Sequence, residues 1–157
     1  AWRHASCVGM MVATGVVEGA GLLCAGALYW PGLVAFGVLL AVLLAVRLLA
    51  WRKYLASLRS AGVPVGTSKA LNALDVRFVW LGHAAPAVLG VVASLGGLPL
   101  LAVLAGVLAA ATGAWFKYTL VCRAAFTQGF ALPQTPSRGG NNAGPGVQPG
   151  WNRIQPE

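Results

Sequence analysis

The sequence predicts an all-α, polytopic membrane protein with four transmembrane helices arranged as two hairpins and with both termini in the cytoplasm. Of its 157 residues, 58% are hydrophobic and only 9% are charged, whereas about a quarter of the residues of a soluble domain are charged. Four apolar runs each have about the 20 residues that a helix needs to cross ~30 Å of hydrocarbon. A buried soluble bundle is the alternative, but four such runs with so few charges argue against it.

Short turn signals divide these runs into two pairs. Residues Tyr29–Gly32, "YWPG", combine two aromatic rings suited to headgroup depth with a Pro-Gly break. Residues Ser94–Pro99, "SLGGLP", break the second pair in the same way. Because both connections are short, each pair is predicted to be an antiparallel hairpin. The spans are expected at about 6–28, 33–50, 78–98 and 100–120, with a connection at 51–77 and a tail at 122–157.

The positions of the cations predict the orientation of the helices. The two hairpin turns hold no charge, whereas the central part of the chain holds six cations against the single acid Asp75. By the positive-inside rule, the N-terminus, the central connection and the tail face the cytoplasm. The net charge of +8 therefore reports topology and some attraction to anionic lipid headgroups, and no nucleic-acid binding is expected from cations spread along membrane edges. The six cations of the central part of the chain are Arg47, Arg52, Lys53, Arg59, Lys69 and Arg77.

The start of the central connection is expected to continue the second helix. In Trp51–Gly62, apolar and basic residues alternate at helical spacing, and Gly62 with Pro64 ends the pattern. Trp51 and Tyr54 suit the membrane interface. A solvated helix end explains the whole segment.

Small residues predict close helix packing. Gly15 and Gly19 form a GxxxG pair followed by Gly21, and the fourth span carries Gly106 and Gly113 near one face. Small residues let helix backbones approach closely in lipid. The pattern does not tell whether the neighbouring helix belongs to this chain or to a partner.

Two ionisable residues inside the spans are candidates for function. Glu18 lies near the middle of the first span, where a charge is costly; it could carry protons, bond a quinol or bond a neighbouring helix while protonated. His83 could ligate a haem, receive a proton from a quinol or bond a backbone carbonyl. A haem b between helices usually needs two axial ligands, and His4 is the other histidine. We therefore expect no haem b in this chain alone.

Catalytic machinery is not apparent. The three cysteines lack the close spacing of zinc or iron–sulfur ligands. Three acidic residues leave little general acid–base chemistry. We expect a non-catalytic chain without a metal site.

The run Trp115–Gly139, "WFKYTLVCRAAFTQGFALPQTPSRG", resembles the C-terminal end of membrane anchor subunits in the dimethyl sulfoxide reductase family of molybdopterin oxidoreductases. The closest likeness is to the phenylacetyl-CoA:acceptor oxidoreductase membrane subunit, and "WRKYLASLRSAGVP" and "LGHAAP" resemble it more weakly. Full members have more spans, so the resemblance covers only their C-terminal half, and the roles of their quinol-binding residues are not carried over. It implies a molybdopterin catalytic subunit, an iron–sulfur subunit, a membrane quinone and a bacterial or archaeal cytoplasmic (inner) membrane.

With this resemblance, the terminal run is expected to dock the iron–sulfur subunit and to form part of the rim of a quinone pocket. Aromatic rings and snorkelling cations at the membrane interface explain much of the run without a partner. The docking residues are expected to be Lys117, Tyr118, Arg123, Phe126 and Phe130, and the residues against the quinone Glu18, His83, Arg123 and Gln128.

Two functions thus remain open. One is a membrane anchor that passes electrons between an iron–sulfur subunit and the quinone pool in a molybdenum or tungsten oxidoreductase. The other is a small transporter-like or structural four-span protein without a redox role. Neither expectation includes a cofactor held by this chain alone.

Overall fold

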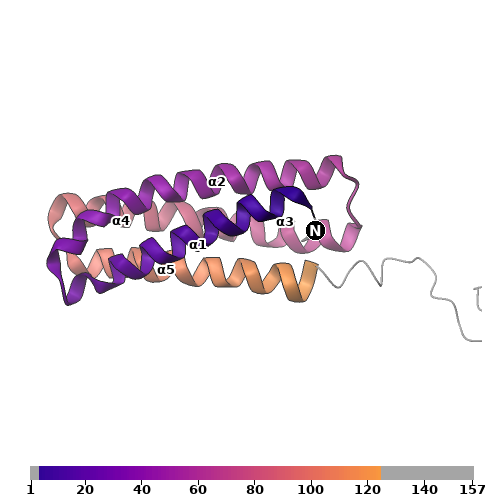
Figure 1. The fold of residues 1–157 in the computed structure, drawn as a ribbon. Coiled ribbons are helices and arrows are strands. Elements are labelled where there is room, and N and C mark those ends of the chain that lie inside the picture. Colours follow the sequence, from indigo (N-terminus) through magenta and orange to yellow (C-terminus); the bar gives the residue numbers. More distant parts are fainter. Residues whose placement is uncertain (1–3, 125–157) are drawn as a thin grey trace, which may run out of the picture.

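The computed structural model describes residues 4–124, and within this range the chain is an all-helical bundle. Four helical segments are long and apolar enough to cross a membrane, which confirms the predicted all-α class and the number of candidate spans within this range. Figure 1 shows the helices lying lengthwise beside one another. The segments are Ala5–Leu28, Pro31–Ser60, Val65–Gly96 and Pro99–Ala124.

Each segment joins an α-helix to a short helical piece of different pitch. The first pair is α1 (Ala5–Ala25) with the 3₁₀ turn η1 (Gly26–Leu28), then the 3₁₀ turn η2 (Pro31–Ala35) with α2 (Phe36–Ser60). The third segment is α3 (Val65–Val79), the π-helical η3 (Trp80–Ala84) and α4 (Ala85–Gly96). The fourth is α5 (Pro99–Thr119) and the π-helical η4 (Leu120–Ala124).

The turns follow from their proline and glycine residues. Pro31 and Pro99 occupy first helical positions, where a missing N–H costs no hydrogen bond. Gly62 and Gly97 have positive φ values of 65° and 62°, which lets the chain leave α2 and α4 without a Cβ clash.

One end of the bundle is basic. It is the end where Ser6 Oγ contacts Ser57 Oγ at 2.7 Å and the Thr67 hydroxyl donates to the Ala124 carbonyl at 3.0 Å. We call it the basic end, because its cations include Arg52, Lys53, Arg59, Lys69 and Arg123.

Helix α3 begins well before the expected third span. The buried residues Leu71, Leu74 and Phe78 recur at helical spacing, so residues left in the predicted connection pack against the bundle as a helix. Only the short turn after Ser60 separates α2 from α3. Helix α2 itself runs to Ser60, as its sequence pattern predicted.

Glycines set the closest helix contacts. Helix α1 packs on α5 and α2, and α4 packs on α2 and α5. A Cβ on Gly21 would lie 2.7 Å from the Gly106 carbonyl oxygen, and one on Gly90 would lie 2.8 Å from the Gly37 oxygen. The prediction of close packing is therefore confirmed at Gly21 and Gly106. Beyond the local backbone of α1, nothing in residues 4–124 lies within 4 Å of a Cβ built on Gly15.

The GxxxG pair, Gly15 and Gly19, makes no close helix contact within the described chain, although close packing was expected at small residues. Gly15 and Gly19 are exposed, and neither has a neighbour for a Cβ. Their spacing of four residues puts both on the outer face of α1, because the inner face carries Thr14, Val17 and Gly21.

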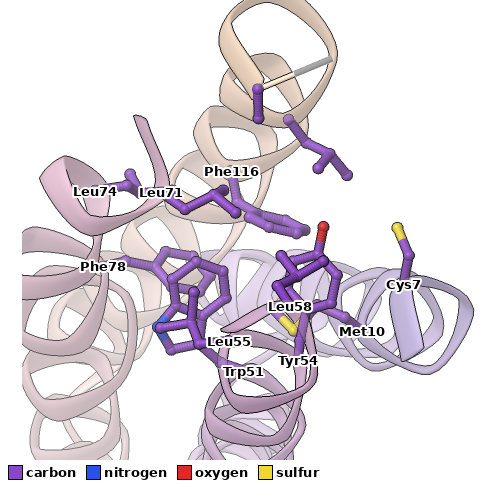
Figure 2. Packing of buried hydrophobic residues seen from close by; sticks show 12 residues of the cluster. Cys7, Met10, Trp51, Tyr54, Leu55, Leu58, Leu71, Leu74, Phe78 and Phe116 are labelled. Atoms are coloured by element: carbon purple, nitrogen blue, oxygen red, sulfur yellow. The ribbon is translucent and has the colours of Figure 1, made fainter. Parts of the chain in front are cut away.

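Aromatic rings fill the core towards the basic end (Figure 2). The Trp51 ring lies 5.2 Å from Phe78 and 5.6 Å from Phe116, both edge-on, and Phe78 stacks on Phe116 at 5.6 Å. Trp51 and Tyr54 are fully buried, so the expectation that they face the membrane interface is wrong. They point inward because α3 and α5 cover this part of α2.

Candidate functional site

A fully buried arginine lies in the middle of the second span. Arg47 has no exposed surface, and it occupies the inner face of α2 with Leu40, Leu44, Trp51 and Tyr54. A charge at this position in a membrane helix is costly unless its hydrogen bonds are met. The surroundings of its guanidinium group therefore decide what the site can do.

The guanidinium donates to three acceptors from two other segments. Its Nε donates to His83 Nε2 at 3.2 Å, its Nη1 donates to the Ala109 carbonyl at 3.3 Å, and its Nη2 donates to the Gly82 carbonyl. The Phe78 ring lies 5.0 Å from its central carbon, within the range of a cation–π contact. Neither ion pair of residues 4–124 includes Arg47. The direct contacts of the positive charge are therefore with carbonyl dipoles, the His83 nitrogen and a ring.

The Gly82 carbonyl lacks the usual α-helical donor because residue 86 is a proline. In an α-helix a carbonyl accepts from the N–H four residues later, and Pro86 has no N–H to give. Gly82 also leaves room, since a Cβ there would lie 3.1 Å from Thr112 Oγ1 and 3.3 Å from Arg47 Nη2. Sequence thus creates both the acceptor and the space beside it.

His83 is held at both ring nitrogens. Its Nδ1 lies 2.8 Å from the Phe78 carbonyl, and its Nε2 accepts from Arg47. A carbonyl can only accept, so Nδ1 carries the proton and the ring is neutral in this arrangement, an assignment made from the partners. Of the roles expected for His83, the bond to a backbone carbonyl is confirmed. A role towards a quinone stays a prediction.

An apolar groove lies against this histidine. It has a volume of about 190 Å³ and lies between residues of α2 and residues of the segment from α3 to α4. Its walls are aliphatic, from residues such as Ala41, Ala45 and Ala87, and His83 is the one lining residue with a polar side chain. The groove therefore offers an apolar slot next to the Arg47–His83 pair.

Glu18 belongs to a separate polar contact. Its carboxylate pairs with Lys117 across α1 and α5, and a Cβ on Gly113 would lie 3.0 Å from its Cγ. The side chains are 20% and 36% exposed, respectively. Glu18 bonds a neighbouring helix, one of its expected roles, and its partner there is the Lys117 amine. No hydrogen bond or ion pair of residues 4–124 joins it to His83.

The terminal run is described only in part. Lys117, predicted to dock a partner, has its amine on Glu18. Tyr118 is 57% exposed and Arg123 is also exposed. Phe126, Gln128 and Phe130 lie outside the described residues.

A third polar contact lies nearer the basic end. Asp75 accepts from the Trp51 indole N–H at 2.6 Å through Oδ1 and from Arg52 Nη1 at 3.2 Å through Oδ2. It joins α3 to α2. Asp75 was expected only as the lone acid among the cations of the connection.

Arg47 is the residue of this site that the sequence prediction missed, because it was counted among the cations that set topology. A signal was present: Leu40, Leu44, Arg47 and Trp51 recur at intervals of three and four residues, which puts the arginine on the same face as large apolar side chains. A cation on the apolar stripe of a membrane helix indicates a buried position.

No group of three or more His, Cys, Asp or Glu residues within 4–124 could hold a metal ion, and Cys7, Cys24 and Cys122 are free thiols. What residues 4–124 do supply is a buried cation, a neutral histidine and an apolar groove. No family model, curated protein or solved structure matches the chain.

Proposed function

We propose that the chain is the membrane anchor and quinone-coupling subunit of a multi-subunit molybdenum or tungsten oxidoreductase. In this role it passes electrons between an iron–sulfur subunit and the quinone pool of a bacterial or archaeal cytoplasmic membrane. The catalytic molybdopterin subunit would be a separate chain. The likeness of Trp115–Gly139 to such anchors motivates the proposal.

The observation that carries the quinone role is the buried Arg47 beside His83 and the apolar groove. A quinone has an apolar body and two carbonyl oxygens that gain negative charge on reduction. The groove is apolar except for His83, and the buried Arg47, which makes no ion pair within residues 4–124, donates to that ring. Positive charge in a low-dielectric setting stabilises a neighbouring oxygen that becomes negative.

His83 would link the ligand to the charge. Both of its nitrogens have partners, so a quinol hydroxyl can bond Nε2 only in exchange for the Arg47 N–H. The guanidinium keeps other N–H groups for Gly82 and Ala109 during such an exchange. The site can therefore accept a hydrogen bond from a ligand without stripping Arg47 of all its partners.

The proposed topology places the basic end in the cytoplasm and the helices as two hairpins. Cations of residues 4–124 gather at that end, whereas the turns at residues 26–35 and 94–99 carry no charge, as the positive-inside rule requires. Tyr118 and Arg123 are exposed near the same end. They would belong to the surface that docks the iron–sulfur subunit.

Purification of the tagged full chain from its native membrane tests the anchor role. We expect a molybdopterin-containing subunit and an iron–sulfur subunit to co-purify. A chain that purifies without either subunit, from membranes that contain quinone, would support the structural or transporter-like alternative instead.

Variants of the groove test the quinone role within that complex. Ala45→Leu places a larger side chain in the groove, and we expect slower quinone-dependent electron transfer with an intact complex. Ala114→Leu is the matched control, because Ala114 is also an exposed alanine of a membrane helix but does not line the groove. Equal rates in the two variants would show that the quinone does not bind in this groove.

A further inference from the structure

We propose that the groove between α1 and α2 binds one anionic phospholipid, with an acyl chain along the groove and the headgroup phosphate at Lys53. This site is separate from the groove at His83, and the inference does not depend on the proposed redox function. It follows from the shape, length and charge of the groove.

The groove is large and apolar along its length. Its volume is about 530 Å³, and small residues of α1 make room for it, since nothing lies within 4 Å of a Cβ on Gly9. The exposed side chains of Val12 and Val46 flank it. Its lining includes Gly9, Ala13 and Val16 from α1 and Leu43, Val46 and Lys53 from α2.

The length of the groove matches one leaflet of a bilayer. From Leu43 to Lys53 the helix rises about 15 Å at ~1.5 Å per residue, which is half of a hydrocarbon core of ~30 Å. Lys53 lies at the basic end of this stretch. An acyl chain along the groove therefore brings the headgroup of the same lipid to the level of the lysine.

The charge of Lys53 is not compensated by the described chain. Residues 4–124 contain two acids, Glu18 and Asp75, and these pair with Lys117 and Arg52. Lys53 is exposed and makes no ion pair within this range. A lipid carries a headgroup phosphate at the depth of Lys53 and an apolar acyl chain that can lie in the groove. The complementarity selects an anionic lipid over a neutral one.

Native mass spectrometry of the full chain in detergent, titrated with phosphatidylglycerol or phosphatidylcholine, tests the proposal. We expect phosphatidylglycerol to occupy one site more tightly than phosphatidylcholine. Lys53→Ala should weaken that site about fivefold, since one cation near an anionic headgroup contributes on the order of 1 kcal/mol. Lys69→Ala, which removes another exposed cation near the basic end, should leave it unchanged.

A second variant separates the groove from the charge. Gly9→Leu places a large side chain in the groove from a position where a Cβ meets no atom outside its own helix, and we expect it to abolish the site. Gly15→Leu is its control, because Gly15 has the same open surroundings but does not line the groove. The melting temperature of each variant without added lipid reports whether the fold is retained.

Four outcomes would overturn the proposal. Equal binding by the wild type, Lys53→Ala and Gly9→Leu would place the lipid elsewhere. Equal affinity for the two lipids would show that the groove binds acyl chains without selecting an anionic headgroup. Displacement of the phosphatidylglycerol by glycerol 3-phosphate would identify a soluble phosphate as the ligand, and displacement by a quinone would make this the quinone groove.

Discussion

The contact between α2 and α4 predicts that Gly37 cannot be replaced by alanine without separating the two helices. A Cβ at Gly37 would overlap the Gly90 carbonyl group, lying 2.8 Å from its carbon, and would lie 2.6 Å from Ser94 Oγ. Ordinary van der Waals contact begins at 3.4 Å. The Gly90 carbon alone therefore requires a shift of about 0.6 Å (3.4 minus 2.8), and because it is backbone, no side-chain rotation can relieve the clash.

The cost follows from two terms. Overpacking of a closely packed contact costs about 1–3 kcal/mol. Displacement of Ser94 also weakens its hydroxyl bond to the Val34 carbonyl, 2.8 Å long, which is worth about 1 kcal/mol. The intrinsic preference of alanine over glycine in a helix acts in the opposite direction. It applies equally to Gly15→Ala, where no atom of residues 4–124 beyond the local backbone of α1 lies within 4 Å of the new Cβ, so the difference between the two variants isolates the clash. We expect Gly37→Ala to be less stable than Gly15→Ala by about 2–4 kcal/mol.

Unfolding in mixed micelles with a rising fraction of sodium dodecyl sulfate measures this difference. Tryptophan fluorescence, to which the buried Trp51 contributes as one of six tryptophans, follows the tertiary packing, and far-ultraviolet circular dichroism follows the helix content. Equal unfolding midpoints for the two variants would refute the reasoning. Because Ala41 and Ala87 line the His83 groove from the same two helices, Gly37→Ala should also alter any ligand binding there.

Three further predictions concern the polar contacts. Glu18→Ala and Lys117→Ala should each destabilise the protein, with a coupling free energy on the order of 2 kcal/mol in a double-mutant cycle in lipid, because each single change leaves one charge unpaired; additive effects would contradict the pairing. Arg47→Lys should lower the unfolding free energy by about 1–3 kcal/mol, because a single ammonium cannot reproduce the planar set of donors and leaves a buried acceptor unmet; an unchanged midpoint would contradict this. Trp51→Phe removes the indole donor to Asp75 and should lower the unfolding free energy by about 1.5–3 kcal/mol. Unfolding measures this loss in the wild-type background and in the Asp75→Asn background, and the loss should be smaller in the latter.

Much of the fold was accessible from the sequence because lipid leaves the chain few choices. Backbone groups in a bilayer must be satisfied within a helix, so apolar length alone predicts four spans, and prolines and glycines mark the turns. Residues 65–77 were harder to assign. Their charges, at Lys69, Asp75 and Arg77, made them resemble a solvated connection, although Leu71 and Leu74 recur at the helical period of a buried face.

The site was predicted only in part, because its chemistry depends on contacts between distant segments. His83 and Glu18 stood out as ionisable residues in apolar runs, but their partners, Arg47 and Lys117, lie on other helices. A sequence pattern shows which face of a helix is apolar, but not which neighbouring helix covers it. Arg47 was misread for this reason: near the end of an apolar run, a cation that anchors a helix at the interface and a cation buried in the bundle have the same sequence appearance.

The π-helical turn η3 constrains how this protein can change over evolutionary time. A π-turn is the geometric trace of one extra residue in an α-helix, and deletion of one residue within Trp80–Ala84 would restore regular winding. Because the π-turn absorbs its extra residue locally, the residues after such a deletion would keep their faces, and Gly90 would still meet Gly37. A deletion in the regular turns between Ala85 and Gly90 would instead rotate every later residue by about 100° around the helix axis and turn Gly90 away from Gly37. The third segment can thus lose a residue at η3 far more readily than between Ala85 and Gly90.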